Sequence, residues 1–347
     1  MKKMSFLFML VLLVGGLFAC SNSQSTSTST NKTEEKKEEV ASEPIVIKFS
    51  HVTAPDSPKG KAADLFKQLV EERTNGKVKV EVYPSSQLFD DDKAIQELPR
   101  NTVQLIAPST TKLVSYDPAF QIVDMPFLFT SDEAVYKFWD GEGGRILSQK
   151  LEKYNIKVLA MWANGDKHFT NSKRPLKKPE DFKGLKFRTQ TGKVLDEQFA
   201  ALGASAVPMG FSEVYVALQQ GTVDGQENTF NNIDTQGYAE VQKYLTVSGH
   251  GRLDYLLLTN TKFWDSLPED VRKTLEEVIA EVTEQQRKWS EELNNESYEK
   301  LKASGMEVYE LTKEDIEAFQ KAMQPVYDKF ADSIGQDLIE LAKKANE

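Results

Sequence analysis

Hydrophobic and polar positions follow two different periods from Ile45 to the end of the chain. Residues 77–83 alternate valines with charged residues, the period of two of a half-buried strand, and residues 59–73 repeat apolar side chains at helical spacing. We expect further strands at 45–49, 103–107, 156–162 and 185–188, and helices at 193–202 and 212–220. Ser212, followed by the acidic Glu213, is the expected N-cap of the last of these helices. This alternation predicts an α/β fold, with open sheets that carry helices on both faces.

Residues 268–303 form the longest stretch of helical pattern. After Pro268 the stretch contains neither Gly nor Pro, and apolar positions recur at helical spacing over its first half. A continuous helix of this length measures about 50 Å at 1.5 Å per residue. Such a length favours a helix that bridges two lobes. Two shorter helices joined by a kink near Asn294 are the alternative.

The N-terminal segment has the features of an export signal. Lys2 and Lys3 precede an apolar run at 6–18, which is too short for a membrane span, and Ala19 and Cys20 follow it. The Leu-x-Ala-Cys sequence resembles the lipobox of bacterial lipoproteins, in which Cys20 becomes the lipidated N-terminus. An ordinary secretory signal with an incidental cysteine is the alternative. We therefore predict a signal peptide at 1–19, and a lipidated Cys20 that starts a flexible Ser/Thr/Lys/Glu tether at 20–43.

The signal peptide and the lipidated cysteine predict an extracytoplasmic location, with the chain lipid-anchored to the outer face of the cytoplasmic membrane or facing the periplasm.

The composition narrows the possible classes of function further. Hydrophobic residues at 39% and charged residues at 28% indicate a soluble globular chain and exclude a polytopic membrane protein. With 43 basic and 53 acidic residues the net charge is −10, which disfavours binding to nucleic acid. One cysteine excludes an internal disulfide framework and a Cys-rich zinc site.

Motifs for catalysis are missing from the sequence. It has no Gly-x-Ser-x-Gly elbow, no phosphate-binding loop and no dinucleotide glycine fingerprint. The three histidines, His51, His168 and His250, are too widely separated to form a local metal-ligand pair. We therefore expect no cofactor, no metal and no enzymatic activity.

A candidate binding residue closes the strand at 185–188. Leu185 and Phe187 share one face, so Lys186 and Arg188 share the other, and Arg188 stands directly before a turn and a helix. Ligands of open α/β sheets bind outside the carboxyl ends of strands and beside helix N-termini. The planar fork of arginine can bind a carboxylate through two parallel hydrogen bonds. Spacing alone leaves a surface arginine at a strand end as an equal alternative.

Several sequence blocks carry a family resemblance. They are Tyr-Pro-Ser-Ser-Gln-Leu at 83–88, Met-Pro-Phe-Leu-Phe at 125–129, Gly-Leu-Lys-Phe-Arg at 184–188, Phe-Ser-Glu-Val-Tyr-Val-Ala-Leu-Gln-Gln-Gly at 211–221 and Val-Asp-Gly-Gln-Glu-Asn at 223–228. In this order they resemble the extracytoplasmic solute receptors of tripartite ATP-independent periplasmic (TRAP) transporters. The similarity extends from Ile45 to about Lys344.

The resemblance implies a two-lobe, periplasmic-binding-protein-like fold, each lobe a mixed sheet flanked by helices, which closes over an organic acid and delivers it to a membrane permease. Lobe I is expected at 44–164 plus 254–293 and lobe II at 165–253 plus 294–347, with the long helix at about 269–303 spanning both. In the family the arginine of the Lys-x-Arg strand pairs with the ligand carboxylate, and that position is Arg188 here. The resemblance further places Asn228, Phe211 and the second cation Lys167 at the site.

Differences from the sialic-acid branch of the family narrow the ligand. That branch has an acid at the position of Ser109, an asparagine at that of Val52 and an arginine at that of Lys167. The sequences around these positions look like the C4-dicarboxylate branch instead. We therefore expect a dianion of the succinate, malate or fumarate type, with Arg188 at one carboxylate, Lys167 at the other, and hydrogen bonds from Ser109, His51 and Asn228.

Two alternatives stay open at this point. The same scaffold can hold another carboxylate, such as a 2-oxo or an aromatic acid. A ligand-sensing lipoprotein that signals to a membrane kinase is the alternative of a different class.

Overall fold

The computed structural model describes residues 43–347. Cys20, the predicted signal peptide and all but the last residue of the predicted tether lie outside the described residues. Within these residues no helix is both long and apolar enough to cross a membrane.

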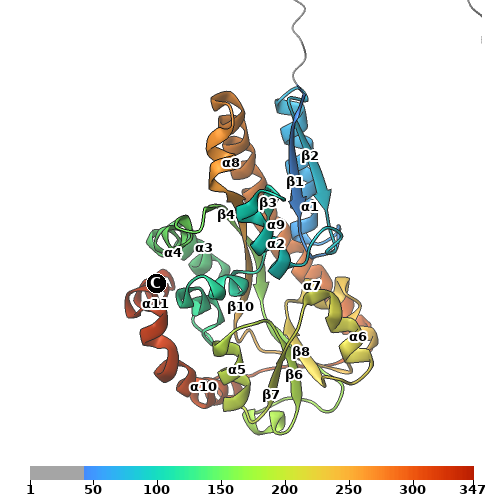
Figure 1. Cartoon of the computed structure of the whole chain (residues 1–347). Helices are drawn as coiled ribbons and strands as arrows, with labels where there is room; N and C mark the ends of the chain where they lie inside the picture. Colours follow the sequence, from blue (N-terminus) through green and yellow to red (C-terminus); the bar gives the residue numbers. More distant parts are fainter. Residues whose placement is uncertain (1–42) are drawn as a thin grey trace, which may run out of the picture. The chain divides into compact units, whose positions relative to one another are not determined.

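Two mixed sheets form the framework, which confirms the predicted α/β class. The first has the strand order β2-β1-β3-β10-β4, with β1 (Ile45–Ser50), β2 (Val78–Tyr83), β3 (Leu105–Ile106), β4 (Ile156–Asp166) and β10 (Arg252–Asn260). The second has the order β11-β9-β5-β8-β6-β7, with β5 (His168–Asn171), β6 (Lys186–Thr189), β7 (Ser205–Pro208), β8 (Gly225–Asn228), β9 (Tyr244–Val247) and β11 (Glu307–Glu310). In Figure 1 strands β1 and β2 lie far from strands β6 to β8. The chain passes between the sheets three times: from β4 to β5, from β9 to β10, and from β10 through α9 to β11.

Helices flank both sheets. They are α1 (Pro58–Arg73), α2 (Asp91–Glu97), α3 (Asp132–Asp140), α4 (Glu142–Glu152), α5 (Lys193–Ala201), α6 (Val214–Gln219), α7 (Phe230–Thr235), α8 (Thr261–Ser266), α9 (Glu269–Ala303), α10 (Lys313–Ile334) and α11 (Gln336–Ala345). Short 3₁₀ turns complete the connections: η1 (Leu98–Arg100), η2 (Thr110–Ser115), η3 (Pro118–Asp124), η4 (Pro179–Phe182), η5 (Phe211–Glu213) and η6 (Tyr238–Glu240).

The predicted N-cap at Ser212 is wrong. The chain enters α6 through the 3₁₀ turn η5, so Ser212 lies inside that turn. The carboxylate of Glu213 folds back and accepts a hydrogen bond from the Gly210 N–H at 2.8 Å. An acidic side chain thus satisfies the free N–H at the start of the turn, and the hydroxyl of Ser212 is not needed there.

The long helix α9 is continuous over 35 residues, as the pattern predicts, and the alternative of a kink near Asn294 is wrong. Its first half packs on α1 and β4 of the first sheet, and a later part packs on α7, which follows β8. Asn294 joins α9 to both chain segments. Its side chain donates to the Asn164 carbonyl at 2.6 Å and accepts from the Asn231 N–H at 2.9 Å.

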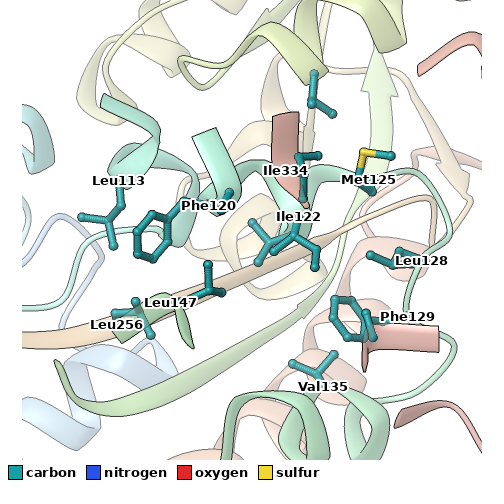
Figure 2. Close-up of a cluster of buried hydrophobic side chains, with 14 of the residues drawn as sticks. Leu113, Phe120, Ile122, Met125, Leu128, Phe129, Val135, Leu147, Leu256 and Ile334 are labelled. Carbon is teal, nitrogen blue, oxygen red and sulfur yellow. The ribbon is translucent and has the colours of Figure 1, made fainter. Parts of the chain in front are cut away.

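Buried apolar side chains hold the elements together. Figure 2 shows one cluster in which Leu147 of α4, Leu256 of β10, Ile122 of η3 and Ile334 of α10 are drawn together. A second cluster lies between the first sheet, α1 and α9, and a third lies around α6 and α7. Burial of this apolar surface is the main term that stabilises the fold.

Candidate ligand-binding site

A cavity lies where side chains from both sheets and their connections meet. Its empty volume is about 450 Å³, counted together with the open space at its mouth. Segments associated with the first sheet contribute Val52, Thr53, Asp90, Asp91, Asp92, Ser109, Lys112, Leu253 and Tyr255. Segments associated with the second sheet contribute Arg188, Gln190, Gly210, Phe211, Asn228 and Asn232.

Arg188 is the central cation of this cavity. Phe187 packs into the core against Phe199, with ring centroids 4.8 Å apart, so strand alternation turns Arg188 to the opposite face. The guanidinium is 2% exposed, and its Nε and Nη2 donate to the Met209 carbonyl at 3.2 and 2.9 Å. Burial lowers its pKa from the ordinary value. Among residues 43–347 no carboxylate lies within ion-pair distance of it, so a buried positive charge whose hydrogen-bond acceptor is neutral faces the cavity.

Neutral hydrogen-bonding groups surround this charge. The Asn228 Oδ1 accepts from the Thr229 N–H at 3.1 Å and from the Asn232 side chain at 2.7 Å. These two bonds fix the amide of Asn228, whose Nδ2 donor is buried without a partner in the described chain. The Ser109 hydroxyl is likewise buried without a partner. Buried polar groups are normally paired, so both are available to a ligand.

Phe211 and His51 take different positions relative to the cavity. Phe211 opens the turn η5 and forms part of the cavity wall. His51 is buried beside the wall residues Val52 and Thr53 but does not line the cavity. Burial and the charge of Lys59 lower the pKa of His51 to about 3, so its ring is neutral at physiological pH. Its Nδ1 lies 3.4 Å from the Thr53 hydroxyl.

Lys167, which the family resemblance places at the site as a second ligand cation, does not line this cavity. Its ammonium group is fully buried and donates to Glu227 at 2.7 Å and to Asp124 at 3.4 Å. The reason is strand alternation on β8, because Asn228 faces the cavity and the preceding Glu227 faces the other side. On that side Glu227 pairs with Lys167. Together with Asp124, two carboxylates therefore already neutralise the charge of Lys167.

The Lys167 cluster continues through His250. Its Nε2 lies 2.7 Å from Glu227, and its Nδ1 lies 2.7 Å from the Ser248 hydroxyl. Burial alone raises the pKa of Glu227, but Lys167 and His250 outweigh burial and hold this pKa below its ordinary value. Burial raises the pKa of Asp124 to about 6 in spite of Lys167. Lys167 lies in the passage from β4 to β5 and His250 in the passage from β9 to β10, so Glu227 connects two of the three segments that join the sheets.

The comparisons with known proteins now identify the family. A family model described as "Bacterial extracellular solute-binding protein, family 7" matches residues 49–333. The chain belongs to this family. It is therefore an extracytoplasmic solute-binding protein and not an enzyme.

Individual relatives and solved structures align with most of this chain. The C4-dicarboxylate-binding periplasmic protein DctP of Rhodobacter capsulatus is 46% identical over 87% of this chain and 91% of its own length. A TRAP periplasmic solute-binding protein from Shewanella oneidensis, solved with bound succinate, superimposes with a TM-score of 0.86 at 42% identity, over 88% of this chain and all of that one. One from Pseudomonas aeruginosa, solved with bound L-malate, gives 0.80 at 43% identity, over 83% of this chain and all of that one.

Sequence reasoning missed several residues of this solute-binding protein's cavity. Asp91 opens α2 and accepts the Ser109 N–H at 3.4 Å, and burial raises its pKa. Lys112 lines the cavity and pairs with Asp92 at 2.7 Å. Tyr255 lies inside the buried strand β10. The acidic run at 90–92 has the pattern of a helix start and Tyr255 that of a core residue, so no local signal marks either as part of a site.

The described residues contain no cluster of His, Cys, Asp and Glu that could hold a metal ion.

Proposed function

We propose that this solute-binding protein captures a C4-dicarboxylate of the succinate, malate or fumarate type in the cavity and delivers it to a TRAP-type membrane permease. The observation that carries the proposal is Arg188, a buried guanidinium without a carboxylate partner in the described chain, at a cavity lined from both sheets. Burying a charge is costly unless it is paired, so the arrangement favours an anionic ligand. The succinate and L-malate bound by similar solved proteins support the choice of acid.

Arg188, Asn228, Ser109 and Phe211 are the proposed ligand contacts. Arg188 binds one carboxylate through a charge-assisted pair, and the free donor of Asn228 adds a hydrogen bond to it. Ser109 supplies a hydroxyl from the first-sheet side, and Phe211 provides an apolar wall. Since the cavity is bounded by both sheets, we propose that the lobes predicted at 44–164 plus 254–293 and at 165–253 plus 294–347 close around the ligand.

The test is a calorimetric titration with a panel of organic acids, followed by Arg188→Ala. We expect C4-dicarboxylates to bind most tightly and the substitution to weaken succinate binding by about 2–5 kcal/mol, because a desolvated carboxylate loses its partner. This corresponds to about thirty-fold up to a few thousand-fold in Kd. Unchanged affinity in the variant contradicts the site assignment, and tightest binding of a 2-oxo or aromatic acid changes the ligand class.

We propose further that Cys20 carries a lipid anchor that holds the protein at the membrane. The position of the cysteine directly after the apolar run and Ala19 supports this. In cells that express the full chain, metabolic labelling with a fatty acid should mark the wild type and not Cys20→Ser. Export of an unlabelled wild type into the soluble extracytoplasmic fraction would refute the anchor and leave the binding function untouched.

A further inference from the structure

Lys59 is a second buried cation of this chain. It stands at the second position of α1 and is 0% exposed. Its Nζ donates to the Ala107 carbonyl at 2.9 Å and lies 3.5 Å from the centroid of the Tyr255 ring. Within residues 43–347 no carboxylate forms a salt bridge with it. A carbonyl and an aromatic face compensate an ammonium only partly for its lost water, so its burial calls for a functional reason.

The position of Lys59 in the helix increases this cost. The N-terminus of α1 carries the positive end of the helix dipole, where acidic side chains are favourable and basic ones are not. The first turn of α1 contains no acidic residue that could offset the charge. The lysine and the helix end therefore add to each other, and together they favour an anion nearby.

Lys59 does not line the cavity itself, but residues beside it do, so its charge acts on a ligand through the wall. Tyr255, whose ring it contacts, lines the cavity, and so does Ser109, two residues beyond its carbonyl partner Ala107. Asp91, also in the wall, is close enough for its charge to act on Lys59. The partnerless hydroxyl of Ser109 marks the same wall as a place for a hydrogen-bonding ligand group. Arg188 reaches the cavity from β6 of the other sheet.

We propose that Lys59 determines the preference for a doubly charged ligand, because its ammonium stabilises the second carboxylate at the Ser109–Tyr255 wall while Arg188 binds the first. This inference rests on the proposed function and names the residue that gives it charge specificity. Lys167 is already neutralised by Glu227 and Asp124. Lys112 is the competing candidate, but Asp92 already pairs with it at 2.7 Å.

The site has a pH dependence that follows from this role. Burial lowers the pKa of Lys59 to about 8, and the charge of Asp91 partly opposes that shift. His51 next to it is neutral above about pH 5, and burial raises the pKa of Tyr255. Lys59 therefore loses its charge as the pH rises through about 8. Affinity for a dianion should then fall by up to about tenfold per pH unit, whereas affinity for a monoanion should change little.

The experiment compares succinate with succinamate, its monoamide, by calorimetry on wild type and on Lys59→Met. We expect Arg188 to bind the carboxylate of succinamate, which places the amide group of succinamate on the side of the cavity near Lys59. We expect Lys59→Met to weaken succinate by about 10- to 100-fold and succinamate by less than about threefold. Lys61→Met is the matched control, since Lys61 is half-buried in the same turn but its ammonium lies over Trp289, which does not line the cavity, and not over Tyr255, which does. It should change neither affinity.

The outcomes separate the two proposals. If wild type binds no dicarboxylate, the proposed function fails and this inference with it. If wild type binds succinate but Lys59→Met loses both ligands equally, or the selective loss appears in Lys112→Met instead, only the inference fails. If Lys59→Met does not fold, the wild type decides, because its ratio of succinate to succinamate affinity should fall between pH 7 and pH 9. A constant ratio over that range overturns the role of Lys59.

Discussion

The buried cationic side chains of this protein fall into two groups. Some have no carboxylate partner in the described part of the chain, and in the others carboxylates already neutralise the charge. Arg188 and Lys59 have neutral partners, whereas Lys167 has two carboxylates and Arg252 has three, from Asp132, Asp166 and Asp254. A buried cation contributes to ligand binding only when its charge is not already compensated within the protein. This distinction explains why a lysine that sequence resemblance places at the site is expected to act in the fold instead.

Lys167→Met tests that distinction. The substitution leaves Glu227 and Asp124 buried without their cation, and breaking a buried pair in this way costs about 3–5 kcal/mol. We expect the free energy of unfolding to fall by that order, measured by urea denaturation. The ratio of succinate to succinamate affinity should stay at the wild-type value in the protein that remains folded. A selective loss of succinate would instead return Lys167 to the role of a ligand cation.

At the scale of elements, one polar side chain of α9 bonds to both neighbouring segments where the helix passes from the first sheet to α7. Asn294 satisfies the Asn164 carbonyl near the end of β4 and the Asn231 N–H in α7, after β8. Asn294→Ala leaves both groups without this partner, and each buried unsatisfied group costs about 1–3 kcal/mol. Urea denaturation should show a lower midpoint. The exposed neighbour Asn295 is the control, and Asn295→Ala should change stability by less than about 0.5 kcal/mol.

The elements themselves were largely predictable, because their periods are local properties. Strand β2 and helix α1 begin within one residue of the expected positions, and α9 is continuous as expected. The strand that carries Arg188 was predictable too, although β6 ends one residue later than expected, at Thr189. The position of the Lys167 side chain could not be predicted from the sequence, because it depends on which face of β8 presents Glu227. The contributions of Asp91, Tyr255 and Lys59 to the cavity region depend on contacts between distant segments, such as Lys59 with Ala107, and no local pattern contains those.

At the scale of the whole molecule, buried neutral histidines couple folding to pH. Burial lowers the pKa of His51 to about 3, with a further contribution from Lys59, and burial lowers that of His168 to about 3, with contributions from His250 and Arg252. The Nδ1 of His168 accepts N–H groups from Ser248 and Gly249, both at 3.2 Å, which holds the ring in one tautomer. In the unfolded chain both rings take up protons near pH 6.5. Between these pKa values the unfolded state binds more protons, so stability falls as the pH falls.

From pH 7 to pH 5 each of these histidines should remove about 2 kcal/mol from the free energy of unfolding, because the folded rings stay neutral over that range. Over the same range the folded Asp124, whose pKa burial raises to about 6, takes up a proton and returns about 1 kcal/mol. The net loss of about 3 kcal/mol is still a large share of the stability of an ordinary domain, which is about 5–15 kcal/mol. Urea denaturation of the wild type at both values should therefore show a clear drop in midpoint. His51→Gln cannot take up a proton, so its drop should be smaller by the share of one histidine, whatever its stability at pH 7. An equal drop in variant and wild type would mean that His51 titrates alike in both states and that its burial does not link folding to pH.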